Sequence, residues 1–235
     1  MHREGVSLND LPNFLEKIKT YPNLKVEGLM SHFASADNRE DPLNQFQIEN
    51  FNKALEICRE NNIYPKWLHL ANSDGLINFN RELNFTTLAR TGLALYGISS
   101  DPNIKPVLIL KSKIIQIKTL QRKTRVGYSG TYTTKKSITI GILPLGYYDG
   151  IDRRLSNKGS VVIGNIVCPI IGRVSMNITN IDLSKIPNPY IGEEVIVYSS
   201  NPKDPNSIEN SAKLCKTIPY DILIHLAAST KRVVL

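Results

Sequence analysis

The spacing of hydrophobic positions differs between the first hundred residues of the chain and the rest. Early in the chain, apolar side chains recur every three or four residues, the period of a helix with one buried face. This pattern predicts helices over about residues 11–20 and 42–61, and a short helix is expected over 74–80. Asp10 is the expected N-cap of the first helix, and Pro42 falls in a first turn, where proline is favourable. The apolar stripe of the second helix consists of Ile48, Phe51, Leu55 and Cys58.

Short apolar runs lie between these helices and predict strands within residues 24–33, 67–71 and 86–89. Strands that alternate with helices long enough to cross over indicate a parallel sheet. The first hundred residues therefore read as an α/β region.

Polar residues follow each of the three predicted strands: His32, then Asn72 and Ser73, then Arg90 with Gly92. In a β/α barrel the carboxyl ends of the strands are where active sites form. Each position also has an ordinary interpretation, since a lone histidine is often a satisfied core residue and Asn-Ser is a common helix cap. Three such positions at successive strand ends favour a site.

From about Val107 onward the helical period is lost. Glycine, proline, asparagine and aspartate separate short β-rich runs, which indicates an all-β domain of hairpins or a barrel. One helix is expected over 208–218, with Ser207 as its cap. Linker composition near 99–106 predicts two domains, residues 1–103 and 104–235. The β-rich runs are residues 108–118, 137–144, 160–171, 176–181 and 193–198.

Two tyrosine-bearing turns, residues 126–132 and 145–150, flank the β-branched run Ser137 to Leu143. Glycines next to a tyrosine allow backbone conformations that other residues avoid, so the ring can be aimed in a fixed direction. The simpler interpretation is an aromatic residue that finishes a hairpin.

Composition narrows the possible roles. The net charge is +8 (29 basic minus 21 acidic residues), but we find no basic stripe interleaved with aromatics, which argues against a nucleic-acid partner. The three cysteines are widely spaced and form no metal signature, so we expect no metal and a reducing compartment. Without a signal peptide or a long apolar run, we expect a soluble cytoplasmic protein with no membrane contact.

The α/β region is too short to form a complete β/α barrel. A complete β/α barrel takes about 250 residues, with about 200 as a lower bound, whereas only about 100 residues alternate here. Either the first domain is a smaller open sheet, or the chain lacks an N-terminal part.

Eight segments together resemble one family in order and spacing. They are residues 1–6 (MHREGV), 29–37 (LMSHFASAD), 69–73 (HLANS), 90–97 (RTGLALYG), 126–132 (VGYSGTY), 145–150 (LGYYDG), 171–177 (IGRVSMN) and 218–221 (IPYD). The family is that of bacterial alanine racemases, pyridoxal 5'-phosphate (PLP) enzymes that interconvert L-alanine and D-alanine for peptidoglycan. The resemblance covers essentially the whole chain and implies a partial β/α (TIM-type) barrel followed by a β-rich C-terminal domain.

The resemblance also implies roles for individual residues. Tyr128 would be the base that removes the α-proton of L-alanine, with His32 and Arg90 as its partners, and Arg90 would also bond the pyridine nitrogen of PLP. Arg3 and Met176 would lie on the substrate side. The expected cofactor-binding residues besides Arg90 are Asn72, Ser73, Gly92, Leu93 and Tyr220, and the walls of the channel by which substrate enters are Tyr147, Asp37 and Arg153. The implied assembly is a head-to-tail homodimer in which Tyr128 and Met176 serve the partner's cofactor.

The chain departs from the family at its N-terminal side. The family's second base is a lysine that also holds PLP covalently, and no lysine here stands at a matching position; a modified lysine that pairs with Arg3 is likewise missing. Ser175 and Asn177 replace the family's cysteine and aspartate. We therefore expect a truncated racemase polypeptide, with the lysine supplied by a separate N-terminal segment if the enzyme is split. The alternatives are a non-catalytic remnant and, less favoured, a basic nucleic-acid-binding module.

Overall fold

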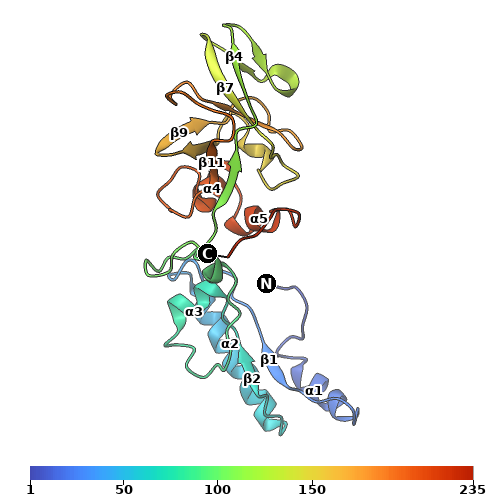
Figure 1. Cartoon of the computed structure of the whole chain (residues 1–235). Helices are drawn as coiled ribbons and strands as arrows, with labels where there is room; N and C mark the ends of the chain where they lie inside the picture. Colours follow the sequence, from blue (N-terminus) through green and yellow to red (C-terminus); the bar gives the residue numbers. More distant parts are fainter. Residues whose placement is uncertain (235) are drawn as a thin grey trace. The chain divides into compact units, whose positions relative to one another are not determined.

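The computed structural model describes residues 1–234 and forms two compact units, Met1–Ile104 and Lys105–Leu235. The first unit, blue to green in Figure 1, combines helices with a short parallel sheet. Its elements are α1 (Leu11–Lys19), β1 (Gly28–Met30), α2 (Pro42–Glu60), β2 (Trp67–His69), α3 (Ser73–Phe79) and the 3-10 helix η1 (Leu93–Tyr96).

Strands β1 and β2 are parallel neighbours, with Gly28 opposite Trp67 and Met30 opposite His69. Helix α2 connects them, as the predicted alternation of strand and helix requires. Among the described residues of this unit the sheet consists of these two strands and is not closed into a barrel.

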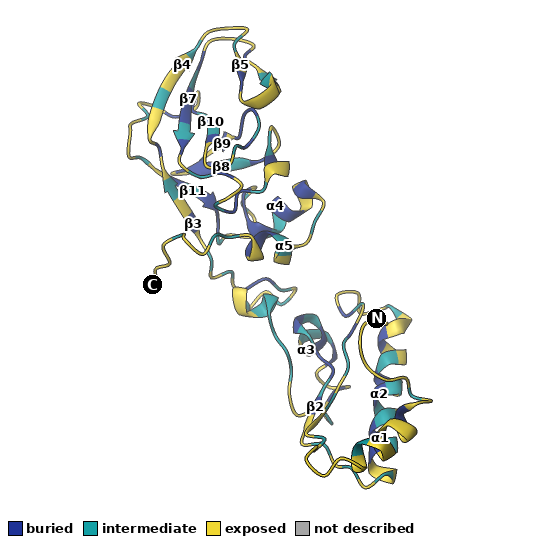
Figure 2. Cartoon of the chain, turned by 90° about the vertical axis from the view of Figure 1, so that its right-hand side faces the viewer, coloured by how far each residue is buried: buried dark blue, intermediate teal, exposed yellow. Residues whose placement is uncertain are grey.

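Helix α2 has the buried stripe that the sequence predicts: Ile48, Phe51, Leu55 and Cys58 are all buried, while the opposite face is open (Figure 2). The stripe packs against Leu68 and other residues around β2, so α2 and the sheet share one core. The helix begins where expected, because the Asp41 carboxylate accepts a hydrogen bond from the Leu43 N–H at 2.9 Å.

Asp10 stands at the N-cap position of α1, as predicted, and its carbonyl accepts the Phe14 N–H at 3.0 Å. Its side chain makes no capping bond to α1. Instead the Ser7 hydroxyl donates to the Asp10 carboxylate at 2.6 Å and accepts the Asp10 N–H at 3.2 Å. The Asp10 carboxylate therefore accepts from Ser7, three residues earlier in the chain, and does not cap the helix.

The predicted third strand over residues 86–89 is also wrong, although the segment does run beside β2. The Thr87 N–H donates to the Leu68 carbonyl at 2.9 Å, as in a ladder. The Leu68 N–H, however, donates to the Thr87 hydroxyl at 2.8 Å, in place of a backbone carbonyl. A side-chain oxygen thus takes the next ladder position and interrupts regular pairing.

The second unit is β-rich, as predicted. Its strands are β3 (Leu110–Lys113), β4 (Gln116–Leu120), β5 (Arg125–Val126), β6 (Tyr132–Thr133), β7 (Ile138–Leu143), β8 (Ser160–Ile163), β9 (Ile166–Pro169), β10 (Thr179–Asp182) and β11 (Glu194–Tyr198). Its helices are η2 (Tyr128–Gly130), η3 (Arg153–Leu155), α4 (Ile208–Cys215) and α5 (Pro219–Ile224).

These strands form antiparallel sheets in the orders β10-β7-β4 and β3-β11-β8-β9, plus the small pair β5-β6. The predicted run 108–118 therefore splits between two sheets. Ser207 caps α4 by accepting the Asn210 N–H at 3.1 Å, as predicted. The helix ends at Cys215, earlier than expected, because Lys216 adopts a left-handed conformation, and Pro219 then starts α5, which was not predicted.

The three cysteines are buried and form no disulfide, as their spacing suggested. Burial raises the pKa of the Cys168 and Cys215 thiols to about 11. Among the described residues there is no cluster of three or more His, Cys, Asp or Glu side chains suited to a metal ion. In residues 1–234 no helix is long and apolar enough to cross a bilayer.

Gly146 is required by a close approach between two loops. The N–H groups of Tyr147 and Tyr148 donate to the carbonyls of Ser175 and Met176, both at 3.0 Å. A Cβ at position 146 would overlap those same two carbonyl oxygens.

We therefore predict that Gly146→Ala lowers the free energy of unfolding of the second unit by about 3 kcal/mol through overpacking. The measurement is urea unfolding followed by circular dichroism. Gly164→Ala is the control: nothing lies within 4 Å of its added Cβ, so its cost is limited to the strain of a φ of +58°. Equal losses in both variants would contradict the steric argument.

Candidate functional site

Arg90 joins the carboxyl ends of the two parallel strands. One guanidinium nitrogen, Nη2, donates to the Ser31 carbonyl at 2.7 Å and contacts the His32 Nδ1 at 3.0 Å. The other, Nη1, contacts the His69 Nδ1 and donates to the His69 carbonyl at 3.2 Å. The structure thus brings together His32 and Arg90, which were predicted, and His69, which was not.

These contacts fix the protonation of both imidazoles. A guanidinium can only donate, so the Nδ1 atoms of His32 and His69 accept, and each neutral ring carries its proton on Nε2. Burial lowers the pKa of His32 below its ordinary value, and the charges of Arg90 and Arg3 lower it further. Burial and the charge of Arg90 lower the pKa of His69 in the same way.

Ser73 is a buried hydroxyl at the start of α3 that organises the turn before η1. Its Oγ accepts the N–H groups of Gly92 at 3.0 Å and Ala94 at 3.3 Å. Among residues 1–234, the Ser73 O–H and the Leu93 N–H have no acceptor. Asn72 acts as the cap of α3 by accepting the Gly75 N–H at 2.8 Å. The start of α3 and the turn before η1 therefore present two free donors, the Ser73 O–H and the Leu93 N–H.

Two further predicted residues belong to the first unit. Arg3 is exposed, yet its charge contributes to the lowered pKa values of both His32 and Arg90. Asp37 is exposed in the loop after β1, and its charge helps burial to raise the pKa of Asp74. Arg3 thus acts electrostatically on the Arg90 cluster, and Asp37 on a residue of α3.

In the second unit, Tyr128 is displayed on a turn that glycine makes possible. Gly127 has a φ of +72° and Ser129 a φ of +59°, and the turn is braced by an Arg125 hydrogen bond to the Ser129 carbonyl at 2.8 Å. The Tyr128 ring is 69% exposed. The ring is therefore presented on the surface of this unit and is not part of its core.

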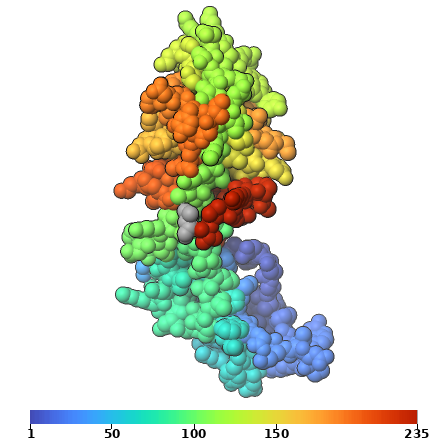
Figure 3. Space-filling model, viewed as in Figure 1, coloured from blue at the N-terminus to red at the C-terminus, as the bar shows by residue number. Residues whose placement is uncertain are grey.

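Tyr147 and Met176 lie on the two loops that Gly146 brings together, and both side chains are exposed. Arg153 is the exposed first residue of η3. Tyr220 lies in α5, which forms part of the red surface segment of this unit in Figure 3.

An ion-pair network that the sequence did not reveal holds α5. Arg154 bonds the Asp152 carboxylate at 2.5 Å and the Asp221 carboxylate at 2.6 Å. The Thr217 hydroxyl also donates to Asp221, at 2.8 Å. Arg154 and Asp221 lie 67 positions apart, so no local pattern in the sequence pairs them.

Comparison with known proteins identifies a family for both units of the chain. A family model described as "Alanine racemase, N-terminal domain" matches residues 1–100, and one described as "Alanine racemase, C-terminal domain" matches residues 107–234. An alanine racemase of Syntrophobacter fumaroxidans is 36% identical over 94% of this chain and 60% of its own length. One of Borreliella burgdorferi is 35% identical over 99% of this chain and 62% of its own.

Solved structures give the same result. The alanine racemase of Streptomyces lavendulae has a TM-score of 0.88 at 26% identity and covers 97% of this chain and 62% of its own. That of Bartonella henselae, solved with covalently bound pyridoxal phosphate, has a TM-score of 0.85 at 25% identity and covers 99% of this chain and 63% of its own.

The two units are therefore those of a two-domain racemase fold. The chain belongs to the alanine racemase family, a family of PLP-dependent isomerases. It spans about 60% of the length of the curated relatives it matches.

The residues present fit both ends of PLP. A phosphate needs several donors, and the Ser73 O–H and Leu93 N–H are free. A pyridine nitrogen needs one donor, and among residues 1–234 the Nε–H of Arg90 has no acceptor. Of the lysines in the first unit, Lys66 precedes β2, at the end of the strand away from His69, and none bonds to the Arg90 cluster.

The lowered pKa values of His32 and His69 make stability depend on pH. Below about pH 6.5 the unfolded chain binds protons at these two positions more readily than the folded chain does. We therefore predict that the first unit loses stability as the pH falls from 7.5 to 5.5. Trp67, the single tryptophan, lies on β2, so its fluorescence during urea unfolding reports this unit.

The matched variant is His32→Asn combined with His69→Asn, in which the amide oxygens can still accept from Arg90. Its urea midpoint should change less between the two pH values than that of the parent chain. An unchanged pH dependence would show that other groups cause it.

Proposed function

We propose that this chain provides the larger part of an alanine racemase, which interconverts L-alanine and D-alanine with PLP. The observation that carries the proposal is Arg90, whose guanidinium is fixed by two strand ends while its Nε–H remains free. In this proposal residues 1–103 are the C-terminal part of a PLP-binding β/α (TIM-type) barrel. Residues 104–235 are the β-rich C-terminal domain.

The proposed cofactor site is built around Arg90 and Ser73. Arg90 would hold the pyridine nitrogen through its free Nε–H, and because a guanidinium keeps its own proton, that nitrogen would stay unprotonated. Ser73, Leu93 and Tyr220 donate to the phosphate. The Gly92 N–H donates to the Ser73 hydroxyl and so holds the turn before η1. Asn72 orients Ser73 by capping α3. When bound, PLP would supply an electron sink for the electron pair left on the α-carbon of alanine when its proton is removed.

Tyr128 is the proposed base on one face of the substrate. Its phenolate oxygen takes the α-proton of L-alanine, which requires cationic or donor neighbours because a free tyrosine has a pKa of about 10. His32 and Arg90 are the proposed partners, and the exposure of Tyr128 on its glycine turn leaves the phenol oxygen accessible to a substrate. This is consistent with the proposed head-to-tail homodimer, in which Tyr128 and Met176 serve the partner's site.

The remaining predicted residues take supporting roles. Arg3 and Met176 contact the substrate, and Tyr147, Asp37 and Arg153 line the channel by which it enters. All five side chains are exposed, as residues that meet a substrate or a partner must be before assembly.

The lysine that holds PLP is proposed to come from polypeptide other than these 235 residues. Its source would be a segment that carries the family's lysine, and the cell compartment would be the cytoplasm. The test is to assay L-alanine to D-alanine conversion by the purified chain with PLP, with and without such a segment taken from a relative. Activity only in the mixture is expected. No activity in a mixture whose parts bind each other would overturn the proposal.

In the active mixture, Tyr128→Phe should slow exchange of the α-proton of L-alanine with solvent by at least about 100-fold, because a positioned general base contributes about that factor or more. Exchange of D-alanine, whose proton leaves from the opposite face, should slow less. Tyr148→Phe is the control, because Tyr148 is an exposed tyrosine of the same unit without a proposed role. Equal slowing for both enantiomers would contradict the assignment of Tyr128 to one face.

A further inference from the structure

The loop between β1 and α2 carries both His32 and Asp37, and it is held by side chains of α2. Gln47 makes two hydrogen bonds to it. Its Nε2 donates to the His32 carbonyl at 2.7 Å, and its Oε1 accepts the Ala34 N–H at 2.9 Å. One side-chain amide therefore bonds the backbone on both sides of Phe33.

Asn44 lies one turn earlier on the same face of α2 and holds the next part of the loop. Its Nδ2 donates to the carbonyls of Ser35 at 3.1 Å and Asn38 at 2.8 Å, so its two bonds bracket Asp37. Asn44 is only 1% exposed. Residues three apart on a helix share a face, so the side-chain amides of Asn44 and Gln47 can both bond the same loop.

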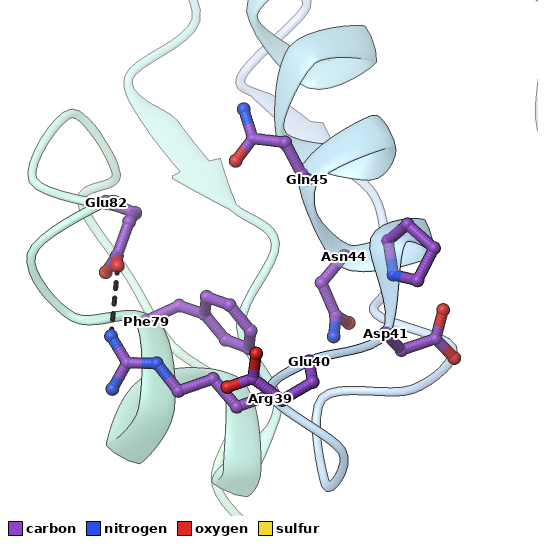
Figure 4. Close-up of a pocket in the computed structure, with 8 residues that line it drawn as sticks. Arg39, Glu40, Asp41, Asn44, Gln45, Phe79 and Glu82 are labelled. Atoms are coloured by element: carbon purple, nitrogen blue, oxygen red, sulfur yellow. Dashed lines mark hydrogen bonds and ion pairs between the residues drawn. The ribbon is translucent and has the colours of Figure 1, made fainter.

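Phe33 anchors the loop between these amide contacts. Its ring is buried and stacks on Phe79 of α3 with the ring centroids 5.3 Å apart. Figure 4 shows Asn44 directed from α2 toward the loop, beside a pocket of about 290 Å³. At the far side of the loop an ion pair between Arg39 and Glu82, at 3.2 Å, ties it to the segment after α3.

We propose that Gln47 is a positioning residue: it fixes the backbone of His32 so that the imidazole Nδ1 stays against Arg90. The importance of His32 for catalysis rests on the proposed function, whereas the positioning itself can be tested without it. A glutamine is suited to this task because one amide supplies a donor and an acceptor at a fixed spacing. Glutamate lacks the donor, and leucine lacks both.

The position of His32 depends on few other contacts. Strand β1 ends at Met30, so His32 lies beyond the backbone ladder that fixes His69 at the end of β2. The charged groups that face the His32 ring are Arg90 and Arg3, and His69 shares Arg90 with it. Loss of the Gln47 bonds should therefore release His32 while leaving His69 in place.

The experiment is NMR titration of the histidine rings in the 235-residue chain without added ligand. In Gln47→Leu the pKa of His32 should rise toward its ordinary value of about 6.5, because the ring moves away from Arg90 and into water. The pKa of His69 should not change. Gln45→Leu is the matched control: Gln45 is on the same helix, but among residues 1–234 its side chain bonds only Glu49, one turn further along the helix.

Three outcomes would overturn the proposal. They are an unchanged His32 pKa in folded Gln47→Leu, an equal shift of His32 in Gln45→Leu, and an equal shift of His69 in Gln47→Leu. The last would mean that the variant loosens the whole Arg90 cluster and not His32 alone.

A second measurement needs no variant. The exposed Ala34 N–H has the Gln47 side chain as its acceptor, so its exchange with solvent should be slowed at least tenfold relative to an unstructured peptide. Exchange at the unstructured rate would show that Gln47 does not hold the loop. Because neither readout uses PLP or alanine, failure of this proposal is distinguishable from failure of the racemase proposal.

Discussion

The first unit depends on a partly buried positive charge that must be satisfied by the ends of two strands. A guanidinium withdrawn from water is tolerated when its N–H groups find acceptors. Arg90 obtains them from the carbonyls of Ser31 and His69 and from two imidazoles. These acceptors come together only when β1 and β2 are parallel and in register. The contacts that orient the arginine therefore also hold the strand ends together.

Helix α2 likewise contributes to both the core and the site. Its apolar stripe packs on the sheet, while Asn44 and Gln47 turn their amides toward the loop after β1. Because the helix is anchored by burial of about four large side chains, it provides a rigid support for polar contacts that are weak individually. In the second unit, glycine has the corresponding role: Gly127 and Gly146 permit the turns and close approaches that display Tyr128 and Tyr147.

Much of the fold could be predicted because it follows from patterns among residues close together in the sequence. The stripe of α2 and the cap at Ser207 follow from neighbours in the sequence, as do the β-rich runs after Val107. The errors occurred where a side chain competes with the backbone or with a remote partner. The Thr87 hydroxyl, in place of a backbone carbonyl, accepts the Leu68 N–H. The Asp10 carboxylate accepts a hydrogen bond from the Ser7 hydroxyl and does not cap its helix. Such contacts depend on rotamers and distances that periodicity does not describe.

For the candidate site, the sequence by itself determined the family, the strand ends that carry polar residues and the importance of His32, Ser73 and Arg90. Only the tertiary structure decided how they are arranged: that His69 shares Arg90 with His32, that Ser73 accepts two amides of the following turn, and that Gln47 holds the loop. The physical reason is that a motif records residues close in the chain. A hydrogen bond between residues 58 positions apart, as between His32 and Arg90, exists only once packing has brought the Arg90 guanidinium to within 3.0 Å of the His32 ring.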